Sequence, residues 1–283
     1  MMTLVKPKAE LWEQPDKESG WKEHIVRCAK VCYKSDKEVD VDKFLEARLN
    51  AGHVSILRHG TKYYRIPIGK FYNTFSSYII HSPYVKIMMD AHELYLAINC
   101  NFLYDHKDVH IILSDYEIDI IEAKNIQFLY ENIFRYTFYL QTQISTSREL
   151  NRVSPNNILE ESTRYVEQGV ICRPWWMVPD IINNSSTPYT SITRQKYFDS
   201  IAYSFAVYQE MINDGMPRED ARGVLPLDTC THVVYTYSIN EWKEIINKRY
   251  FGTTGKPHKN AREIIGQVLH ILENEYGKEF FEY

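Results

Sequence analysis

The clearest pattern along the chain is a strict alternation of apolar and polar positions in residues 134–141. Its apolar members are Phe134, Tyr136, Phe138 and Leu140, and the positions between them are Arg135, Thr137, Tyr139 and Gln141. Because successive side chains of a strand point to opposite faces of a sheet, this period of two predicts a half-buried strand. Residues Val233–Tyr237 and 61–68 predict two further strands, the latter with Pro67 at an edge position or at the strand end.

The strongest helical pattern lies in residues 197–213. One face of this predicted helix carries the apolar side chains Ile201, Phe205, Tyr208 and Ile212. The Asp214-Gly215 pair after it is a typical C-terminal stop, and Pro217 suits the first turn of a new helix. We predict further helices over residues 20–33, 41–51, 85–100, 118–132, 240–249 and 259–275.

Another helix is predicted directly after the strand at 134–141. Thr146 and Glu149 have the spacing of a capping box at a helix start. The helix should stop near Ser154-Pro155, because a proline disfavours helical geometry in the residue before it. No internal repeat, low-complexity tract or linker divides the sequence, so we predict a single α/β domain over residues 1–283.

Composition and charge narrow the class of protein. The 283 residues include 33 Lys and Arg against 37 Asp and Glu, a formal net charge of −4. Proteins that coat nucleic acid need many cationic contacts to phosphates, so this class is disfavoured. No run approaches 18 apolar residues, and the first residues lack a signal-peptide core, so we expect neither a membrane span nor a secretory leader. The 22 Tyr favour strands and half-buried surfaces, and they can place hydroxyls near a polar ligand.

The five cysteines are odd in number and scattered, which indicates reduced thiols of a cytoplasmic protein rather than a disulfide framework. Cys28 and Cys32 lie four apart, but no second Cys/His pair has matching spacing, so we interpret them as core residues and expect no metal. His53 and His59 lie six apart in Gly52–His59, which is not a metal spacing either and suits a polar helix end.

Arginines mark the remaining polar clusters. The segment Arg148–Arg152 is followed by the segment Glu160–Tyr165, which contains a Ser-Thr-Arg run. Such a run can bind a phosphate or carboxylate, or it can be an exposed loop held by an ion pair with one of the two preceding glutamates. Arg222 stands among Ala, Val, Leu and Pro, which indicates a buried partner or an anionic ligand. Arg249 lies at the end of a predicted helix, where a cation is favourable even when no ligand is bound.

Several common catalytic motifs are missing from the sequence. It contains no Gly-x-Gly-x-x-Gly, P-loop, His-Glu-x-x-His or Gly-x-Ser-x-Gly. Cys230 has His232 two residues on, which would share a strand face, but this pair is weak support for a nucleophile.

Taken together, the clusters resemble one family, the flavin-dependent thymidylate synthases. The blocks that carry the resemblance follow in collinear order: Glu10–Asp16, Cys28–Ser35, Gly52–Gly60, Glu149–Tyr165, Ala221–Pro226 and Asn240–Arg249. The resemblance implies a mixed, largely antiparallel sheet flanked by helices, and a homotetramer with active sites at subunit junctions. It also implies reductive methylation of dUMP to dTMP, with methylenetetrahydrofolate and NADPH as co-substrates and FAD as cofactor.

By position, the resemblance also assigns site residues. Those expected to contact dUMP are Glu149, Arg152, Ser162, Thr163, Arg164, Arg222 and Arg249, with Arg152 and Arg222 as the catalytic pair. Those expected beside FAD are His53, Ser55, Arg152, Ser154, Asn157, Ser238 and Glu244. A nucleotide phosphate needs bidentate, permanently charged donors, which suits these arginines.

Departures from the family pattern gather on the flavin side. The family's Arg-His-Arg is Arg152-Val153-Ser154 here, Asn157 replaces a serine, Arg58 replaces a glutamate, and Glu244 stands where relatives often carry His or Asn. Two alternatives to a flavin-dependent synthase therefore stay open. One is an enzyme with altered C5 chemistry on a pyrimidine deoxynucleotide, such as hydroxymethylation, and the other is a nucleotide-binding homologue without flavin or catalysis.

Overall fold

Four antiparallel strands form the sheet at the centre of the molecule. The computed structural model describes residues 3–71, 79, 81–153, 157–177 and 189–281. The central strands lie in the order β2 (Lys8–Trp12), β7 (Arg135–Gln143), β10 (Cys230–Ser238) and β8 (Ile158–Glu160). β7 and β10 pair along their whole length, from Arg135 opposite Ser238 to Gln143 opposite Cys230. The strands predicted at 134–141 and Val233–Tyr237 are confirmed.

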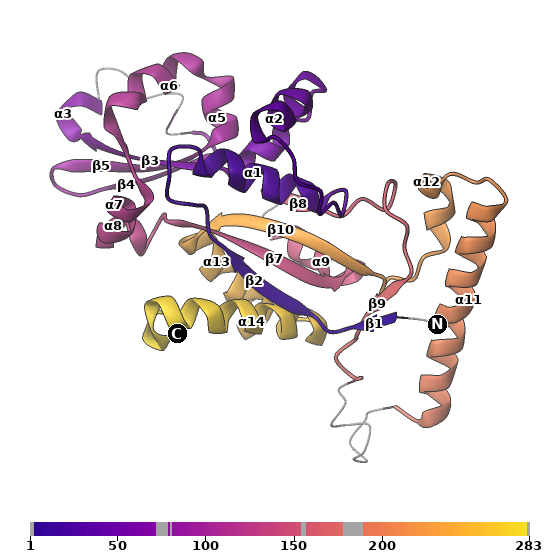
Figure 1. Cartoon of the computed structure of the whole chain (residues 1–283). Coiled ribbons are helices and arrows are strands. Elements are labelled where there is room, and N and C mark those ends of the chain that lie inside the picture. Colours follow the sequence, from indigo (N-terminus) through magenta and orange to yellow (C-terminus); the bar gives the residue numbers. More distant parts are fainter. Residues whose placement is uncertain (1–2, 72–78, 80, 154–156, 178–188, 282–283) are drawn as a thin grey trace.

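Both faces of β7 are covered, so the prediction of a half-buried strand is wrong for most of its length. All four side chains from Arg135 to Phe138 are buried. Helix α1 (Gly20–Val31) lies on one face of the sheet, and α13 (Ile239–Ile246) and α14 (Lys259–Tyr276) lie on the other (Figure 1). Alternation along a strand separates its two faces, but packing decides whether water reaches either of them.

A second antiparallel sheet lies beside the central one (Figure 1). Its strands follow in the order β4 (Val85–Met89), β5 (Glu93–Asn99), β3 (Thr61–Pro67) and β6 (Glu117–Ile118). The predicted strand at 61–68 is therefore confirmed, with Pro67 at its end. The predicted helix over 85–100 is wrong, because Asp90 Oδ1 accepts hydrogen bonds from the backbone N–H groups of His92 and Glu93, both at 2.8 Å, and turns the chain into a hairpin.

Short helices surround the second sheet: α3 (Ile68–Phe71), α5 (Cys100–Asp105), α6 (Lys107–Leu113), η2 (Ser114–Tyr116), α7 (Ile120–Asn125) and α8 (Gln127–Tyr130). The helix predicted over 118–132 is thus two helices, divided at Ile126, whose backbone is extended. A third, two-stranded sheet pairs β1 (Thr3–Val5) with β9 (Val170–Cys172) in parallel. The predicted fold class, a mixed and largely antiparallel sheet structure flanked by helices, is confirmed.

Most other predicted helices are present. The predictions at 20–33, 41–51 and 259–275 correspond to α1, α2 (Val41–Asn50) and α14. The one at 240–249 is α13 followed by the π-helix η4 (Asn247–Phe251), which ends at Gly252 with a φ of 81°. The structure also contains the 3-10 helices η1 (Val54–His59) and η5 (Lys278–Phe280).

Helix α9 (Ile144–Asn151) begins directly where β7 ends, earlier than predicted. The Thr146 hydroxyl donates to Gln143 Oε1 at 2.8 Å and caps no backbone N–H, so the predicted capping box is wrong. α9 ends at Asn151, and the predicted stop at Ser154-Pro155 lies outside the described residues.

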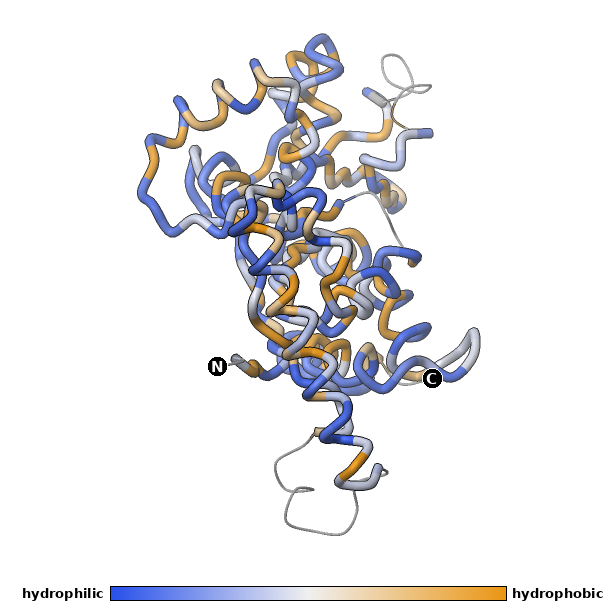
Figure 2. The backbone as a smooth tube through the Cα atoms, turned by 90° about the vertical axis from the view of Figure 1, so that its right-hand side faces the viewer, coloured by the Kyte–Doolittle hydropathy of each residue, from blue (hydrophilic) through white to orange (hydrophobic). Residues whose placement is uncertain are grey.

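The long helix α11 (Ser191–Asn213) stands apart from the central sheet (Figure 1). It contains the predicted helix at 197–213, and Ile201 and Tyr208 of the predicted face are buried. Its outer side keeps Tyr203 72% exposed, and Figure 2, in which this side of the molecule faces the viewer, shows apolar positions recurring along it. Pro217 is the N-cap of α12 (Arg218–Ala221), which continues into η3 (Arg222–Val224).

Candidate functional site

A cavity of about 580 Å³ opens between α9, the end of β8 with the turn that follows it, and η3 with the residues up to Leu227. We call it the arginine pocket. Its polar lining residues are Arg148, Glu160, Glu161, Ser162, Thr163 and Arg222. The pocket therefore brings together two polar clusters predicted from the sequence: the one around the Ser-Thr-Arg run and the one around Arg222.

Arg222 is exposed in this pocket and keeps most of its hydrogen-bonding capacity. Its Nε donates to the Glu219 carbonyl oxygen at 3.0 Å, and one terminal nitrogen donates to Thr163 Oγ1 at 3.1 Å. A guanidinium has five N–H groups, so about three remain for a ligand. The buried partner that the apolar sequence context suggested is wrong, because η3 carries Arg222 to the surface. The other interpretation, an anionic ligand, stays a prediction.

The turn after β8 holds the two hydroxyls beside Arg222. The Ser162 backbone N–H donates to the carbonyl oxygen of Cys32, the C-cap residue of α1, at 3.0 Å, which fixes the turn to the end of this helix. Ser162 Oγ accepts from the Arg164 backbone N–H at 3.3 Å. The Arg164 side chain leaves the pocket and donates twice to Glu219 Oε2, from Nε at 2.9 Å and from a terminal nitrogen at 2.7 Å. The ion pair predicted with Glu160 or Glu161 is therefore made with Glu219 of α12 instead.

Two adjacent carboxyls of the pocket wall have opposite pKa shifts. Burial raises the pKa of Glu160, although hydroxyls of Ser147 and Thr231 donate to it at 2.7 and 3.0 Å. Burial also acts to raise the pKa of Glu161, but hydrogen bonds from His232 and Gln168 outweigh it and lower that pKa. The pocket thus holds one carboxyl whose pKa is raised and one whose pKa is lowered, and shifted pKa values are often found at functional sites.

Sequence reasoning treated Glu160 and Glu161 only as partners for a surface arginine. Glu160 is the last residue of the short strand β8, where it is half-buried, and Glu161 follows it and is only 5% exposed. A pair of acidic residues at the end of an apolar strand is the signal that could have identified them.

The remaining residues predicted to contact dUMP lie at the other end of α9. Arg249 donates from Nε and from a terminal nitrogen to the Glu149 carbonyl oxygen at 3.3 and 3.2 Å. Its Nε also lies 3.7 Å from the Glu149 carboxylate. Arg152 is exposed as the C-cap residue of α9. None of these three lines the arginine pocket, so one chain arranges the predicted dUMP residues in two groups.

Two residues predicted beside FAD are buried, with their polar groups engaged inside the chain. The Asn157 backbone carbonyl accepts from the Thr236 backbone N–H at 3.2 Å, and its side-chain Oδ1 accepts from Asn99 Nδ2 at 3.4 Å. Ser238 is the N-cap of α13 and forms a capping box with Glu241.

The other predicted flavin residues lie apart on the surface. His53 and Ser55 are exposed at the start of η1, and Glu244 is exposed on α13, where it pairs with Lys248. Ser154 lies outside the described residues. Within one chain, the described members of this set do not form a cradle for a flavin.

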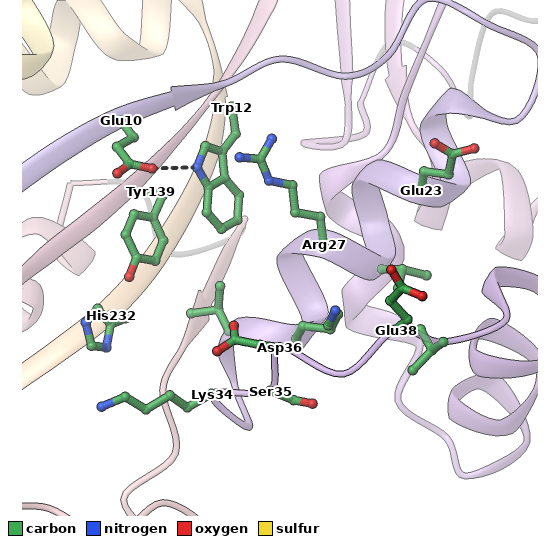
Figure 3. A pocket seen from close by; sticks show the side chains of 14 residues that line it. Glu10, Trp12, Glu23, Arg27, Lys34, Ser35, Asp36, Glu38, Tyr139 and His232 are labelled. Atoms are coloured by element: carbon green, nitrogen blue, oxygen red, sulfur yellow. Dashed lines mark hydrogen bonds between the residues drawn. The ribbon is translucent and has the colours of Figure 1, made fainter.

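A larger open cavity of about 780 Å³ lies on the α1 side of the central sheet (Figure 3). Trp12 stacks on Tyr139 with ring centroids 4.7 Å apart, and the Arg27 guanidinium lies 4.0 Å from the Trp12 ring centre on α1's side. Tyr139 in turn stacks on His232 at 5.7 Å, and His232 hydrogen-bonds to Glu161. Both faces of Trp12 are thus covered by protein, so these rings form a packed ladder that reaches the wall of the arginine pocket.

All five cysteines lie among the described residues and are free thiols, and Cys28 is fully buried in α1. In the described part of the chain, no three His, Cys, Asp or Glu side chains gather as metal ligands would. No helix described in the structure has the length and apolar character needed to cross a bilayer.

Comparisons with known proteins place this geometry in context. The family model described as thymidylate synthase complementing protein matches residues 132–276, which is 145 of the 283 residues. The match contains β7, α9, the arginine pocket and η4, while the second sheet lies before it. No curated protein matches the chain.

Solved structures of comparable length share little sequence with the chain. Two of them are of the UMP/dUMP methylase PolB from Streptomyces cacaoi, one bound with 5-Br UMP and one with 5-Br dUMP. Each is 15% identical, over 99% of this chain and 96% of that chain, with a TM-score of 0.48. A likeness at this level adds nothing to the fold described above.

Proposed function

Since the chain belongs to the thymidylate synthase complementing protein family, we propose that it is a thymidylate synthase-like methylase acting on dUMP. The observation that carries this proposal is Arg222, which keeps about three unused N–H groups beside the hydroxyls of Ser162 and Thr163. A guanidinium beside two hydroxyls suits the oxygens of a nucleotide 5′-phosphate, since Arg binds phosphate through parallel hydrogen bonds.

The roles of the chain's own residues follow from this placement. Arg222 would hold the phosphate, Thr163 would orient Arg222 through its hydroxyl, and Ser162 would donate to a phosphate oxygen. Arg148, exposed one turn into α9, adds a second cation to the same pocket. Holding the nucleotide in one orientation is the main demand of a one-carbon transfer to C5, because correct positioning lowers the barrier of such a step.

Family membership also suggests FAD, NADPH and methylenetetrahydrofolate as cofactor and co-substrates, and a homotetramer as the assembly. The flavin residues of one chain are either buried and engaged or dispersed on the surface. We therefore infer that FAD, if this chain binds it, requires residues of neighbouring subunits. We infer a shared nucleotide site for the same reason: another copy of the chain would complete it with its Arg152, Glu149 and Arg249.

The experiment that tests the nucleotide site is a calorimetric comparison of dUMP with deoxyuridine. The two ligands share base and sugar, so the difference isolates the phosphate. We expect dUMP to bind and deoxyuridine to bind at least tenfold more weakly. Equal affinities, or no binding of dUMP, would contradict the phosphate role of the arginine pocket.

A second candidate function keeps the nucleotide site without the flavin. It is favoured by Asn157 and Ser238, whose polar groups are used inside the chain. The protein would then carry out altered C5 chemistry, such as hydroxymethylation, or bind the nucleotide without catalysis. The absorbance spectrum of the purified protein, recorded after incubation with FAD and removal of unbound FAD, separates the two functions, because only the first leaves an oxidised-flavin spectrum on the protein. Mass spectrometry of the nucleotide products then separates altered chemistry from binding alone.

A further inference from the structure

The first residue of β7, Arg135, is a buried cation without a carboxylate partner in the described chain. It is 9% exposed, and its terminal nitrogens donate to Thr61 Oγ1 at 2.8 Å and to the carbonyl oxygens of Arg58 and Thr236 at 3.1 and 3.0 Å. All three acceptors are uncharged, and no described carboxylate lies within 4.0 Å of its guanidinium. A buried charge costs several kcal/mol unless an opposite charge compensates it.

A cavity of about 240 Å³ lies against this arginine, and we call it the Arg135 cavity. Apolar walls come from both sheets and from α7, and they include Leu11, Tyr63, Ile120 and Phe134. Three of the five N–H groups of the guanidinium are engaged by the bonds above, so about two remain. The volume falls just below the usual range of ligand pockets, roughly 300–1,000 Å³, so the cavity suits a small molecule and excludes a nucleotide.

The described groups that line the Arg135 cavity give the arginine no ion-pair partner. The Glu241 carboxylate acts to raise the Arg135 pKa through its charge, but it does not line the cavity and is paired with Lys86 at 2.9 Å. Burial lowers the pKa of His24 to about 4 and holds the pKa of His59 well below its ordinary value, so both rings are neutral at pH 7. Lys124 is paired at 2.7 Å with Glu13, which is exposed, and Asp16 is exposed as well. Among the described residues that line the cavity, Arg135 is thus the one buried charge without an ion-pair partner.

The histidines belong to a chain of hydrogen bonds that ends in an unused group. His24 Nε2 lies 2.8 Å from Thr137 Oγ1, which lies 2.7 Å from Thr236 Oγ1, and His59 Nδ1 lies 2.7 Å from the same Thr236 hydroxyl. His59 Nε2 is buried without a partner among the described residues. A buried polar atom left unpaired costs free energy, which a polar ligand or water would recover.

We propose that the Arg135 cavity binds a small organic carboxylate, with its anionic group on Arg135 and a short apolar body against Tyr63, Phe134 and Ile120. The site is separate from the arginine pocket, because Arg135 begins β7 and the pocket follows its far end, about 27 Å away at the rise of an antiparallel strand. An occupant would contact β3 of the second sheet and β7 and β10 of the central one.

Benzoate is the probe, with benzyl alcohol as its neutral counterpart and inorganic phosphate as an anion without an apolar body. We expect calorimetry to show that benzoate binds the full chain at least tenfold more tightly than either, and that Arg222→Ala leaves this affinity unchanged. Benzyl alcohol binding as well as benzoate would overturn the proposal, and so would loss of benzoate binding in Arg222→Ala.

A pair of surface variants tests the site without disturbing buried groups. Ile121 lines the cavity and is 57% exposed, so Ile121→Glu and Ile121→Lys place opposite charges at the mouth of a folded protein. We expect benzoate to bind about twofold to fivefold more weakly with Glu and more tightly with Lys, the range for exposed charge pairs. Ile111, 72% exposed on α6 and outside this cavity, is the matched position, where neither charge should matter. Equal benzoate affinity in the two Ile121 variants would contradict the proposal.

Discussion

The two arginines that line cavities at opposite ends of β7 have the same side chain and very different surroundings. Arg222 is exposed, with two of its N–H groups engaged, whereas Arg135 is buried and bridges a hydroxyl and two carbonyl groups from three elements. Replacing the exposed arginine should cost little stability, and under the proposed function its free N–H groups serve a ligand. Replacing the buried one should cost more, because oxygens of three elements inside the fold then lose their donor.

The largest expected difference between Arg135 and Arg222 is in their contribution to the free energy of unfolding. We expect Arg135→Ala to lower the free energy of unfolding by about 3–5 kcal/mol, because it leaves three buried oxygens without donors. Arg222→Ala should change it by less than about 0.5 kcal/mol, as for other exposed positions. Urea denaturation of both variants measures the difference. Similar losses in the two variants would mean that Arg222 is also a structural residue.

The next effect concerns nucleotide binding. Arg222→Ala should weaken dUMP binding by about 1.5–3 kcal/mol, the range for hydrogen bonds to charged groups. Arg164→Ala is the control, because its side chain pairs with Glu219 outside the pocket, and it should cost clearly less. Isothermal calorimetry with dUMP gives both values. An unchanged affinity in Arg222→Ala would show that the phosphate binds elsewhere.

A smaller effect should follow from the hydroxyl that holds Arg222. Thr163→Val keeps the shape of the side chain and removes the 3.1 Å hydrogen bond to the guanidinium. We expect dUMP affinity to fall by about 0.5–1.5 kcal/mol, the usual net value of one such bond. In the Arg222→Ala background the same substitution should cost almost nothing, since the two residues act together. Full additivity in this double-mutant cycle would contradict the positioning role of Thr163.

The smallest effect lies in the acid response of the two adjacent glutamates. The pKa of Glu161 is below its ordinary value of 4.5 in the folded chain, so its contribution to stability is present above pH 4.5 and is lost as the pH falls through the folded pKa. Glu161→Gln should therefore flatten the loss of stability below pH 4.5.

Glu160 provides the opposite case. Its pKa is raised, so its ionisation costs stability as the pH rises above 4.5, and Glu160→Gln should relieve that cost at neutral pH. Urea denaturation from pH 3.5 to 7 distinguishes the two variants. The same pH profile in both would contradict the opposite shifts.

Local patterns predicted much of the fold and part of the candidate site. The strands at β7 and β10 and the helices α11 and α14 follow from periodicity and from stop signals such as Asp214-Gly215. The sequence predicts a helix where the structure has the hairpin at 85–99, because the apolar residues of these two strands, most of them buried in β5, show no alternation. Periodicity alone does not distinguish such a strand from a buried helix.

By itself, the sequence determined most element types, the family and the arginines that a nucleotide phosphate would need, because these depend on residue type and local spacing. The tertiary structure alone decided that Arg222 is exposed, that Arg164 turns away to Glu219, and that Arg135 is buried instead of facing solvent. The physical reason is that burial depends on what packs against a strand or turn. The second sheet packs beside Arg135, whereas an open cavity lies beside Arg222. Both surroundings are built from segments that are distant in sequence.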